Sequence, residues 1–439
     1  MKFTGCFPSS LIKRHCDITL GKMLQPTALR ADDCLHPYLR AANIEWGRID
    51  LCDLKQMYFS KSDLSKYSVS TGDLVVLEGG DVGRASIVPQ ELDGTGFQNS
   101  VHRVRARKGN HIPFALFWMQ HLKSSGYFDL VCSKATLAHF TSEKFAVTPF
   151  PLIDLPTQKR IAAFLDYETA RIDDLIAKKE RLVEVLGEKR AALITAAVTG
   201  QISANNHGEA AERGGGMMRL RHMLKLSPSA QEIRGAEPTN EVTFAPMDAI
   251  RDGAGGLDLS ITKPLSEVQS GSYNYFTNGD VLLAKVTPCF ENGKKALAAN
   301  LNGQIGYATS EVHVLRPDPG KLWAPFLMYL LASENFRAEG MRSMTGAGGL
   351  RRVAESAILN CRLAITDLPT QKRIAAFLDY ETAQIDKLIA KMKQLVEALK
   401  EKRAALITAA VTGQIDVNSY SKAGTTSQTL DRIREEVMA

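Results

Sequence analysis

The sequence contains seven cysteines, and no two of them have the Cys-x-x-Cys spacing that zinc ribbons use. It contains no run of about 18 apolar residues, the length that a membrane-spanning helix needs. The first residues, Met1 to Cys6, lack the apolar segment of a secretory signal peptide. Scattered cysteines are typical of free thiols in a reducing compartment. We therefore expect a cytoplasmic protein without a membrane span, a disulfide framework or a zinc ribbon.

Motifs of common cofactor-dependent enzymes are also absent. No Gly-x-x-x-x-Gly-Lys-Ser/Thr loop is present, which argues against an ATP-driven motor in this chain. Thr287-Pro288-Cys289-Phe290 stands where an amino-methyltransferase would have Asn-Pro-Pro-Tyr, but it lacks the Asn and the second Pro. The nine histidines show no ligand spacing such as His-x-x-x-His. We expect no catalytic residue, metal or cofactor in this chain; a free-standing enzyme is an alternative.

The net charge is small, because 54 Lys and Arg residues stand against 48 Asp and Glu residues, which leaves +6. Hydrophobic residues make up 44% and charged residues 23%, an ordinary balance for domains that form a core. A length of 439 residues predicts about two to four domains. No polybasic tail is present, so any nucleic-acid binding must come from local patches.

One internal repeat dominates the chain. Residues 155–202 and residues 368–415 are identical at 41 of 48 positions. Both copies begin with Leu-Pro, which suits a first helical turn, and both are rich in Ala, Leu, Lys, Arg and Glu without an interior proline. Gly200 and Gly413 are the expected helix ends. The repeat therefore predicts two long helices of nearly identical sequence.

Apolar residues in both repeats alternate at steps of three and four, the spacing of a coiled-coil seam. Neither helix can bury its seam alone, so we expect the two copies to pair antiparallel within one chain. The alternative is that each helix packs on its neighbouring domain or on another subunit. Polar residues, among them Lys179 and Lys189, are expected at the seam edges. The expected seam residues are Ile172, Leu175, Leu182, Leu186, Leu193, Ile385, Leu388, Leu395, Leu399 and Leu406.

The segments before the two repeats are far less alike, but they share a skeleton. A Gly-Asp turn precedes a short β-branched or leucine-rich run in each, which predicts strands over Leu74–Leu77 and Val281–Ala284. Further strands are expected over His102–Arg107, Phe145–Ile153, Ile305–Arg316 and Ala357–Ile365, and helices over Pro113–Leu122 and Pro325–Phe336.

The expected fold class is α+β, with two globular mixed α/β domains separated by two long helices that pair as an antiparallel coiled coil, a pseudo-twofold internal repeat. The expected boundaries are 1–154 and 217–367 for the variable domains, 155–202 and 368–415 for the helical repeats, 203–216 for a flexible linker and 416–439 for a polar C-terminal tail.

Several of these segments resemble the specificity subunit of type I restriction-modification systems, and the resemblance covers nearly the whole chain. The order of variable domain, helical repeat, variable domain and helical repeat is that of the family. The segments that carry the resemblance are Leu155–Asp166, Leu368–Asp379, Glu188–Ile194, Glu401–Ile407, Gly279–Lys294, Pro37–Ile44 and Glu78–Arg84.

The resemblance implies a non-catalytic subunit of a DNA-modifying complex. The variable domains would be target-recognition domains, each of which recognises one half of a bipartite, asymmetric site in double-stranded DNA. The helices would set the spacing between the halves and dock two methyltransferase subunits, which use S-adenosylmethionine to methylate adenine. Motor-nuclease subunits would add translocation and cleavage that depend on ATP and Mg²⁺. The alternative is a coiled-coil protein-interaction scaffold without DNA specificity; no membrane role is implied.

Residues that contact base edges are expected to be Arg, Lys, Asn, Gln, Ser or Thr, and phosphates are contacted mainly by Lys and Arg. The segments Ser133–Thr136 and Thr345–Arg352 are favoured, because they stand at equivalent positions before the last predicted strand of each domain. The candidates in the first domain are Arg40, Asn43, Arg84, Gln98, Asn99, His102, Arg103, Lys134 and Thr136. Those in the second domain are Lys285, Thr287, Lys294, Lys295, Tyr307, Ser310, Arg342, Arg351 and Arg352.

Overall fold

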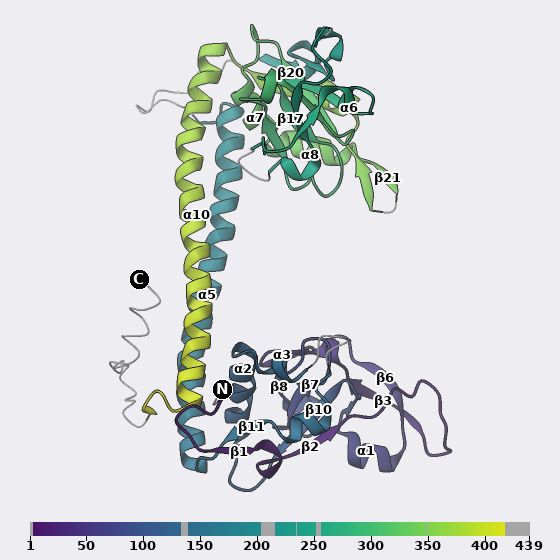
Figure 1. Ribbon diagram of the computed structural model, residues 1–439, viewed down its shortest axis with the longest axis vertical. Coiled ribbons are helices and arrows are strands. Elements are labelled where there is room, and N and C mark those ends of the chain that lie inside the picture. Colours follow the sequence, from purple (N-terminus) through teal and green to yellow (C-terminus); the bar gives the residue numbers. More distant parts are fainter. Residues whose placement is uncertain are drawn as a thin grey trace. The chain divides into compact units, whose positions relative to one another are not determined.

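A computed structural model of the chain describes residues 3–132, 139–202, 216–233, 235–251, 256–347 and 349–417. The chain divides into two compact units: unit 1 is Met1–Glu180 with Lys393–Ala439, and unit 2 is Arg181–Met392. Two long helices, α5 (Leu155–Val198) and α10 (Leu368–Val411), each contribute one half to each unit (Figure 1). The predicted mixed fold, with two domains and two long helices, is confirmed.

The core of unit 1 lies on both sides of an antiparallel sheet with the strand order β2-β10-β7-β8. Leu74 and Val76 of β7 pack with Trp118 of helix α2 on one side. Val75 and Leu77 pack on the other side with residues near a second sheet, β6-β3-β9. The uninterrupted apolar run of β7 therefore reflects burial on both faces. The elements before α5 are β1 (Ser9–Leu11), β2 (Cys16–Leu20), β3 (Cys34–Leu39), β4 (Ile44–Glu45), β5 (Arg48–Ile49), β6 (Lys55–Phe59), α1 (Lys61–Tyr67), β7 (Leu74–Leu77), β8 (Ala85–Ile87), β9 (Gly96–Phe97), β10 (Val101–Ala106), α2 (Ile112–Ser124), α3 (Tyr127–Val131), α4 (Ser142–Ala146) and β11 (Pro149–Pro151).

Unit 2 repeats this plan with the strand order β13-β20-β17-β18 and a second sheet, β15-β14-β19-β16. Val281 and Leu283 of β17 pack with Phe326 of α7, while Leu282 faces a second cluster that contains Phe276. The elements between α5 and α10 are β12 (Gly216–Arg219), β13 (Leu224–Leu226), β14 (Glu241–Ala245), β15 (Thr262–Pro264), α6 (Leu265–Gln269), β16 (Asn274–Thr277), β17 (Val281–Ala284), β18 (Lys295–Leu297), β19 (Ile305–Ala308), β20 (Val312–Pro317), α7 (Ala324–Leu330), α8 (Glu334–Arg342), β21 (Thr345–Ala347), β22 (Leu350–Arg352), α9 (Glu355–Asn360) and β23 (Arg362–Ile365).

The aspartate of each Gly-Asp turn is buried and forms an ion pair with a partly exposed arginine of the neighbouring strand. In unit 1, Arg105 Nε lies 2.8 Å from Asp73 Oδ1. In unit 2, Arg316 Nε lies 2.7 Å from Asp280 Oδ1. Because a buried carboxylate without a partner is costly, this pair fixes the same strand pairing in both domains. The Gly-Asp turn that both domains share in sequence therefore has the same structural role in each domain.

Two predicted strands are partly wrong. The segment Phe145–Ile153 contains the end of α4 before β11, and Ala357–Ile365 contains most of α9 before β23. Short apolar runs fit a single helical turn as well as a strand, so periodicity could not separate them. The predicted strand Ile305–Arg316 is divided into β19 and β20. In each domain the first strand pairs with the last, β1 with β11 and β12 with β23.

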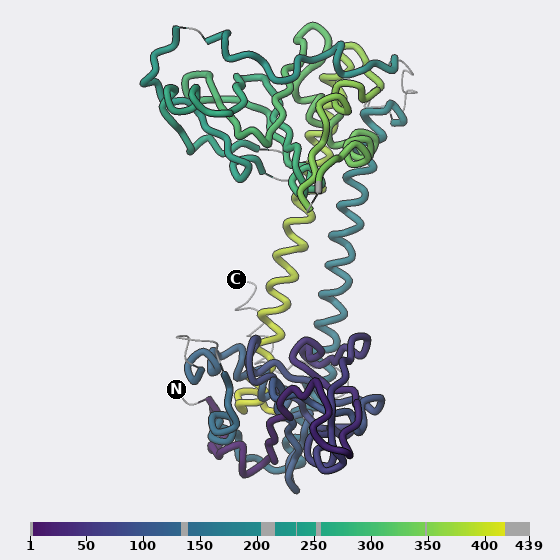
Figure 2. Tube along the Cα trace, turned by 90° about the vertical axis from the view of Figure 1, so that its right-hand side faces the viewer, coloured from purple at the N-terminus to yellow at the C-terminus, as the bar shows by residue number. Residues whose placement is uncertain are grey.

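In each unit the halves of α5 and α10 lie antiparallel (Figure 2). In unit 1, Ile172 of α5 belongs to the same buried cluster as Leu406 of α10, and in unit 2, Ile194 of α5 belongs to the same cluster as Leu378 of α10. Both helices end before a glycine with positive φ, Gly200 and Gly413. The predicted antiparallel pairing is confirmed.

The predicted seam is buried or partly buried at seven of its ten residues and exposed at the other three. Ile172, Ile385 and Leu406 are buried, and Leu186, Leu193, Leu395 and Leu399 are partly buried. Leu175 and Leu388 are 45% and 47% exposed, and Leu182 is also exposed; the next residues in the chain, Ile176, Ile389 and Val183, are more buried. The helix pair also packs on the domain of its unit. The buried stripe of each helix is therefore shifted by one residue from the predicted seam at these positions.

All seven cysteines are free thiols. Within the described ranges, no helix combines the length and the apolar character that crossing a membrane requires.

Candidate nucleic-acid interface

The hairpin β21–β22 projects from unit 2 and carries two of the predicted DNA contacts, Arg351 and Arg352 (Figure 1). Its turn and the strand β22 are held by Thr287. The Thr287 hydroxyl donates to the carbonyl oxygen of Gly349 at 2.8 Å and accepts from the N–H of Arg351 at 2.9 Å. The two guanidinium groups are exposed, with Arg351 3.3 Å from Glu291 and Arg352 3.7 Å from Glu311. The hairpin therefore presents two arginines on an anchored backbone.

Four further candidates of unit 2 lie at or near the surface. Lys285 is half-buried, and its carbonyl oxygen accepts from the N–H of Val353, just after the hairpin. Lys294 is also half-buried, with Nζ 3.5 Å from the carbonyl oxygen of Met247. Ser310 and Arg342 are exposed, and Arg342 lies 3.5 Å from Glu339 of its own helix. The structure thus brings Lys285, Arg351 and Arg352 to one part of the domain.

In unit 1 the two predicted arginines are held by carboxylates. Arg40 forms an ion pair with Asp53, and Arg84 Nη1 lies 3.0 Å from Glu45 Oε2. Gln98 and Asn99 are half-buried in the turn after β9, where the N–H of Asn99 donates to the carbonyl oxygen of Lys22 at 2.9 Å. These four residues remain candidates for DNA contact.

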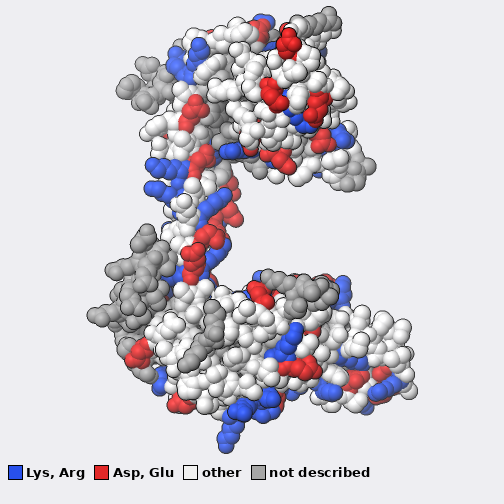
Figure 3. Space-filling model, viewed as in Figure 1, with Lys and Arg blue, Asp and Glu red and all other residues white. Residues whose placement is uncertain are grey.

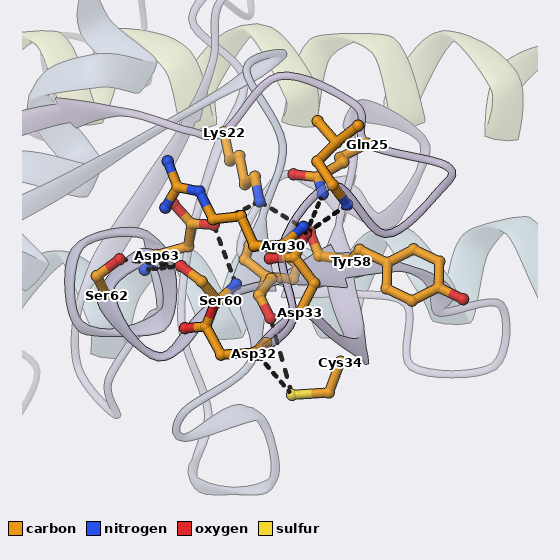
Figure 4. Close-up of polar contacts among 12 residues, drawn as sticks. Lys22, Gln25, Arg30, Asp32, Asp33, Cys34, Tyr58, Ser60, Ser62 and Asp63 are labelled. Carbon is orange, nitrogen blue, oxygen red and sulfur yellow. Dashed lines mark hydrogen bonds and ion pairs between the residues drawn. The ribbon is translucent and has the colours of Figure 1, made fainter.

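An ordered loop beside this turn was missed by sequence reasoning. Lys22 Nζ donates to Asp63 Oδ2 at 2.6 Å and to the carbonyl oxygen of Tyr58 at 2.8 Å (Figure 4). Asp33 Oδ2 accepts from Gln25 Nε2 at 2.7 Å and from the N–H groups of Leu29 and Arg30. The N–H of Leu29 is the main reason that the pKa of the Asp33 carboxyl lies below its usual range. An aspartate three residues after Arg30 was the only sequence signal for this closed turn.

Six predicted DNA contacts are buried instead. His102 Nε2 lies 2.7 Å from the carbonyl oxygen of Phe140, and burial lowers the pKa of this imidazole. Arg103 donates to the carbonyl oxygens of Lys66 and Ser68. A buried side chain cannot reach a base edge, so the prediction of DNA contacts is wrong for this group, whose members stabilise the fold instead. Its members are Asn43, His102, Arg103, Thr287, Lys295 and Tyr307. Two other candidates, Lys134 and Thr136, lie outside the described residues, as does the favoured segment Ser133–Thr136.

Comparison with known proteins finds a family match in the first part of the chain. Residues 19–185 match the family model of the type I restriction modification DNA specificity domain. These residues belong to that family. The chain is 35% identical over 155 residues to the EcoAI specificity subunit of Escherichia coli, which is 35% of this chain and 26% of that protein. The matched stretch thus spans about a quarter of that relative's length.

Two longer matches extend beyond the specificity domain. The StySPI specificity subunit of Salmonella potsdam is 23% identical over 389 residues, 84% of this chain and 82% of that protein. A chain from a solved structure, described as the structural basis of complex assembly and conformational transition of the type I R-M system, matches 93% of this chain and 98% of its own length. The TM-score is 0.67 at 18% identity, so the two chains share a fold.

Acidic and basic side chains are interspersed on the face of the specificity domain and of unit 2 that Figure 3 presents. This agrees with the small net charge of +6. On this face the described basic side chains form no continuous patch, so any phosphate contact made there would come from single residues.

Each unit also has a cavity where the domain meets the helix pair. In unit 1 its volume is about 530 Å³, and it is lined by Arg403 and Asp173 of the helices and by Trp46 of the specificity domain. In unit 2 the cavity of about 350 Å³ is lined by the repeat equivalents, Arg190 and Asp386.

Lys295 also lines the cavity of unit 2. Burial, together with the neighbouring Arg190 and Arg337, lowers the pKa of Lys295 to about 8. Among the described residues, no three His, Cys, Asp or Glu side chains are grouped so that they could hold a metal ion.

Proposed function

We propose that this chain is the DNA sequence-specificity subunit of a type I restriction-modification complex. One observation carries the proposal: two units that share one four-stranded sheet order display different surface loops but contain halves of two nearly identical helices. Identical helices suit two copies of one partner, and different loops suit two different half-sites. Residues 1–154 would recognise one half of a bipartite, asymmetric site in double-stranded DNA, and residues 217–367 the other half.

The partners on the helices would be two methyltransferase subunits. Leu175 and Leu388 stand at equivalent repeat positions and are almost equally exposed, and Tyr167 and Tyr380 are also exposed. Large apolar side chains on a helix surface, at the same place in both copies, are suited to bind the same protein twice. The helices would also set the spacing between the half-sites.

The chain would have no catalytic role. S-adenosylmethionine would be bound by the methyltransferase subunits, and ATP and Mg²⁺ by motor-nuclease subunits that join the same complex. The complex would methylate adenine in both half-sites or cleave unmethylated DNA, and it would act in the cytoplasm.

The decisive experiment is methylome sequencing of cells with and without this gene, in the presence of the methyltransferase subunits. We expect a split motif with methylated adenine in both halves, present only when the gene is present. The purified complex should bind that motif with an affinity that falls steeply with salt, because phosphate contacts release counterions. A complex that assembles but binds no DNA would instead identify the chain as a protein-interaction scaffold.

A further inference from the structure

The hairpin β21–β22 exposes an apolar side chain beside its arginines. Leu350 opens β22, is 43% exposed and is followed directly by Arg351 and Arg352. A single exposed leucine is common on protein surfaces and needs no explanation by itself. Leu350 differs because it lies on a projecting, hydrogen-bonded ribbon whose other exposed side chains, among those described, are polar.

The alternation of side chains along a strand assigns these residues to two faces. Leu350 and Arg352 lie on one face of the ribbon with Thr345, which pairs with Arg352. Arg351 lies on the opposite face, where its strand partner is Gly346. One face therefore combines a hydroxyl, an apolar group and a guanidinium.

The ribbon is held in place by hydrogen bonds to Thr287. Besides the two hydrogen bonds of Thr287, the N–H of Thr287 donates to the carbonyl oxygen of Arg351 at 3.0 Å. The strands also approach closely at Gly346, where a Cβ atom would stand 2.4 Å from the carbonyl oxygen of Leu350. The φ of Gly346 is +141°, a value that side-chain-bearing residues rarely adopt. The backbone of β22 beside Leu350 is thus held by hydrogen bonds in the free chain, which lowers the entropic cost of binding there.

We propose that Leu350 contacts the 5-methyl group of a thymine in the major groove of the DNA half-site bound by unit 2. This inference rests on the proposed function. The major groove, about 12 Å wide, admits a two-stranded β-ribbon, whereas the minor groove is about 6 Å wide. The thymine methyl is the apolar group that base edges present in the major groove. Arg352, on the same face, would contact a neighbouring guanine or phosphate.

The test uses the assembled complex with methyltransferase subunits and the split motif found by methylome sequencing. Each thymine of both halves is replaced in turn by deoxyuridine, which removes only the methyl group. Affinities are measured for the wild type, Leu350→Ala and the control Ile261→Ala, a residue of the same unit that is 37% exposed. At one thymine we expect deoxyuridine to weaken wild-type binding about fourfold, the effect of one buried methyl group.

Leu350→Ala should bind the thymine duplex about fourfold more weakly and should no longer distinguish thymine from deoxyuridine at that position. Ile261→Ala should behave as the wild type. Equal sensitivity of Leu350→Ala and wild type to every deoxyuridine would overturn the inference, as would wild-type binding that no deoxyuridine weakens. Loss of assembly in Leu350→Ala would also overturn it, since Leu350 would then face a protein. If the wild-type complex binds no DNA selectively, the proposed function itself fails.

Discussion

The guanidinium of Arg190 on α5 is bound in a bidentate manner by the carboxylate of Asp386 on α10, with Nε 2.9 Å from Oδ1 and Nη2 3.1 Å from Oδ2. Arg403 and Asp173 are the repeat equivalents of these residues with the helices exchanged, and Arg403 Nε lies 2.8 Å from Asp173 Oδ1. The two ion pairs consist of the same residue types at equivalent repeat positions, because one antiparallel register of the helices brings each arginine to its aspartate. They connect the sequence identity of the repeats directly to the pairing of the helices.

The first prediction concerns this pair. Arg190→Ala should lower the free energy of unfolding by about 1 kcal/mol, because a bidentate, partly buried pair is worth more than an exposed one. Arg181→Ala removes an exposed pair with Glu184 on the same helix and should change stability little. Urea unfolding of the full chain measures both. An equal effect of the two changes would contradict the role of Arg190 in setting the register.

The second prediction separates the buried stripe of α5 from its exposed stripe. Ile172→Asp should destabilise unit 1 by roughly 3 kcal/mol or more, since it buries an unpaired charge. Leu175→Asp, three residues away, should change stability by less than about 0.5 kcal/mol. Leu175→Asp should nevertheless weaken assembly with methyltransferase subunits, as followed by size-exclusion chromatography. If a stable Leu175→Asp chain still assembles fully with methyltransferase subunits, the exposed stripe of α5 is not their docking surface.

The third prediction concerns the arginines of the hairpin. Arg352→Ala should weaken binding by about 1–3 kcal/mol if it contacts a guanine, and should relax specificity at one position of one half-site. Arg362→Ala, an exposed arginine on β23, serves as the control and should leave specificity unchanged. Competition binding with single-base variants of the motif gives the measurement. Loss of assembly in Arg352→Ala would show a structural role instead.

The fourth prediction is a pH dependence of stability. The pKa of Lys295 is about 8 in the folded chain, below the ordinary lysine value of 10.5, so between these two values the unfolded state binds more protons. The contribution of Lys295 to the free energy of unfolding therefore rises as the pH increases from about 8 to about 10.5. Below pH 8 Lys295 is charged in both the folded and the unfolded state, and its destabilising effect on the fold is complete. The stability difference between Lys295→Met and wild type should shift in favour of wild type over that window. A constant difference in urea unfolding from pH 7 to pH 10.5 would contradict the lowered pKa.

The fifth prediction concerns spacing. Removal of seven residues from each helix, 179–185 and 392–398, deletes about two turns and retains both Arg–Asp pairs. The bases recognised should remain the same, and the gap between the half-sites should shorten by about three base pairs, from 1.5 Å per helical residue and 3.4 Å per base pair. Methylome sequencing of the variant tests this. Altered bases with an unchanged gap would show that the helices contact DNA rather than set the spacing.

Periodicity and repetition were enough to predict the two long helices, their antiparallel pairing and the strands Leu74–Leu77 and Val281–Ala284. These features follow from local patterns, since a long helix or a doubly buried strand shows its character within its own residues. The segments before β11 and β23 were less predictable, because a few apolar residues fit a helical turn or a strand equally well.

Local sequence patterns are sufficient to place the two long helices and to show that the same helix surface occurs twice. Which side of each helix is buried depends on the packing of the folded units, in which Ile176 rather than Leu175 faces inward. The same packing also decides which polar residues are available for DNA, burying His102 and Lys295 while exposing Arg351 and Arg352. Burial depends on packing against residues that are distant in the chain, and a local residue pattern carries no information about these distant neighbours.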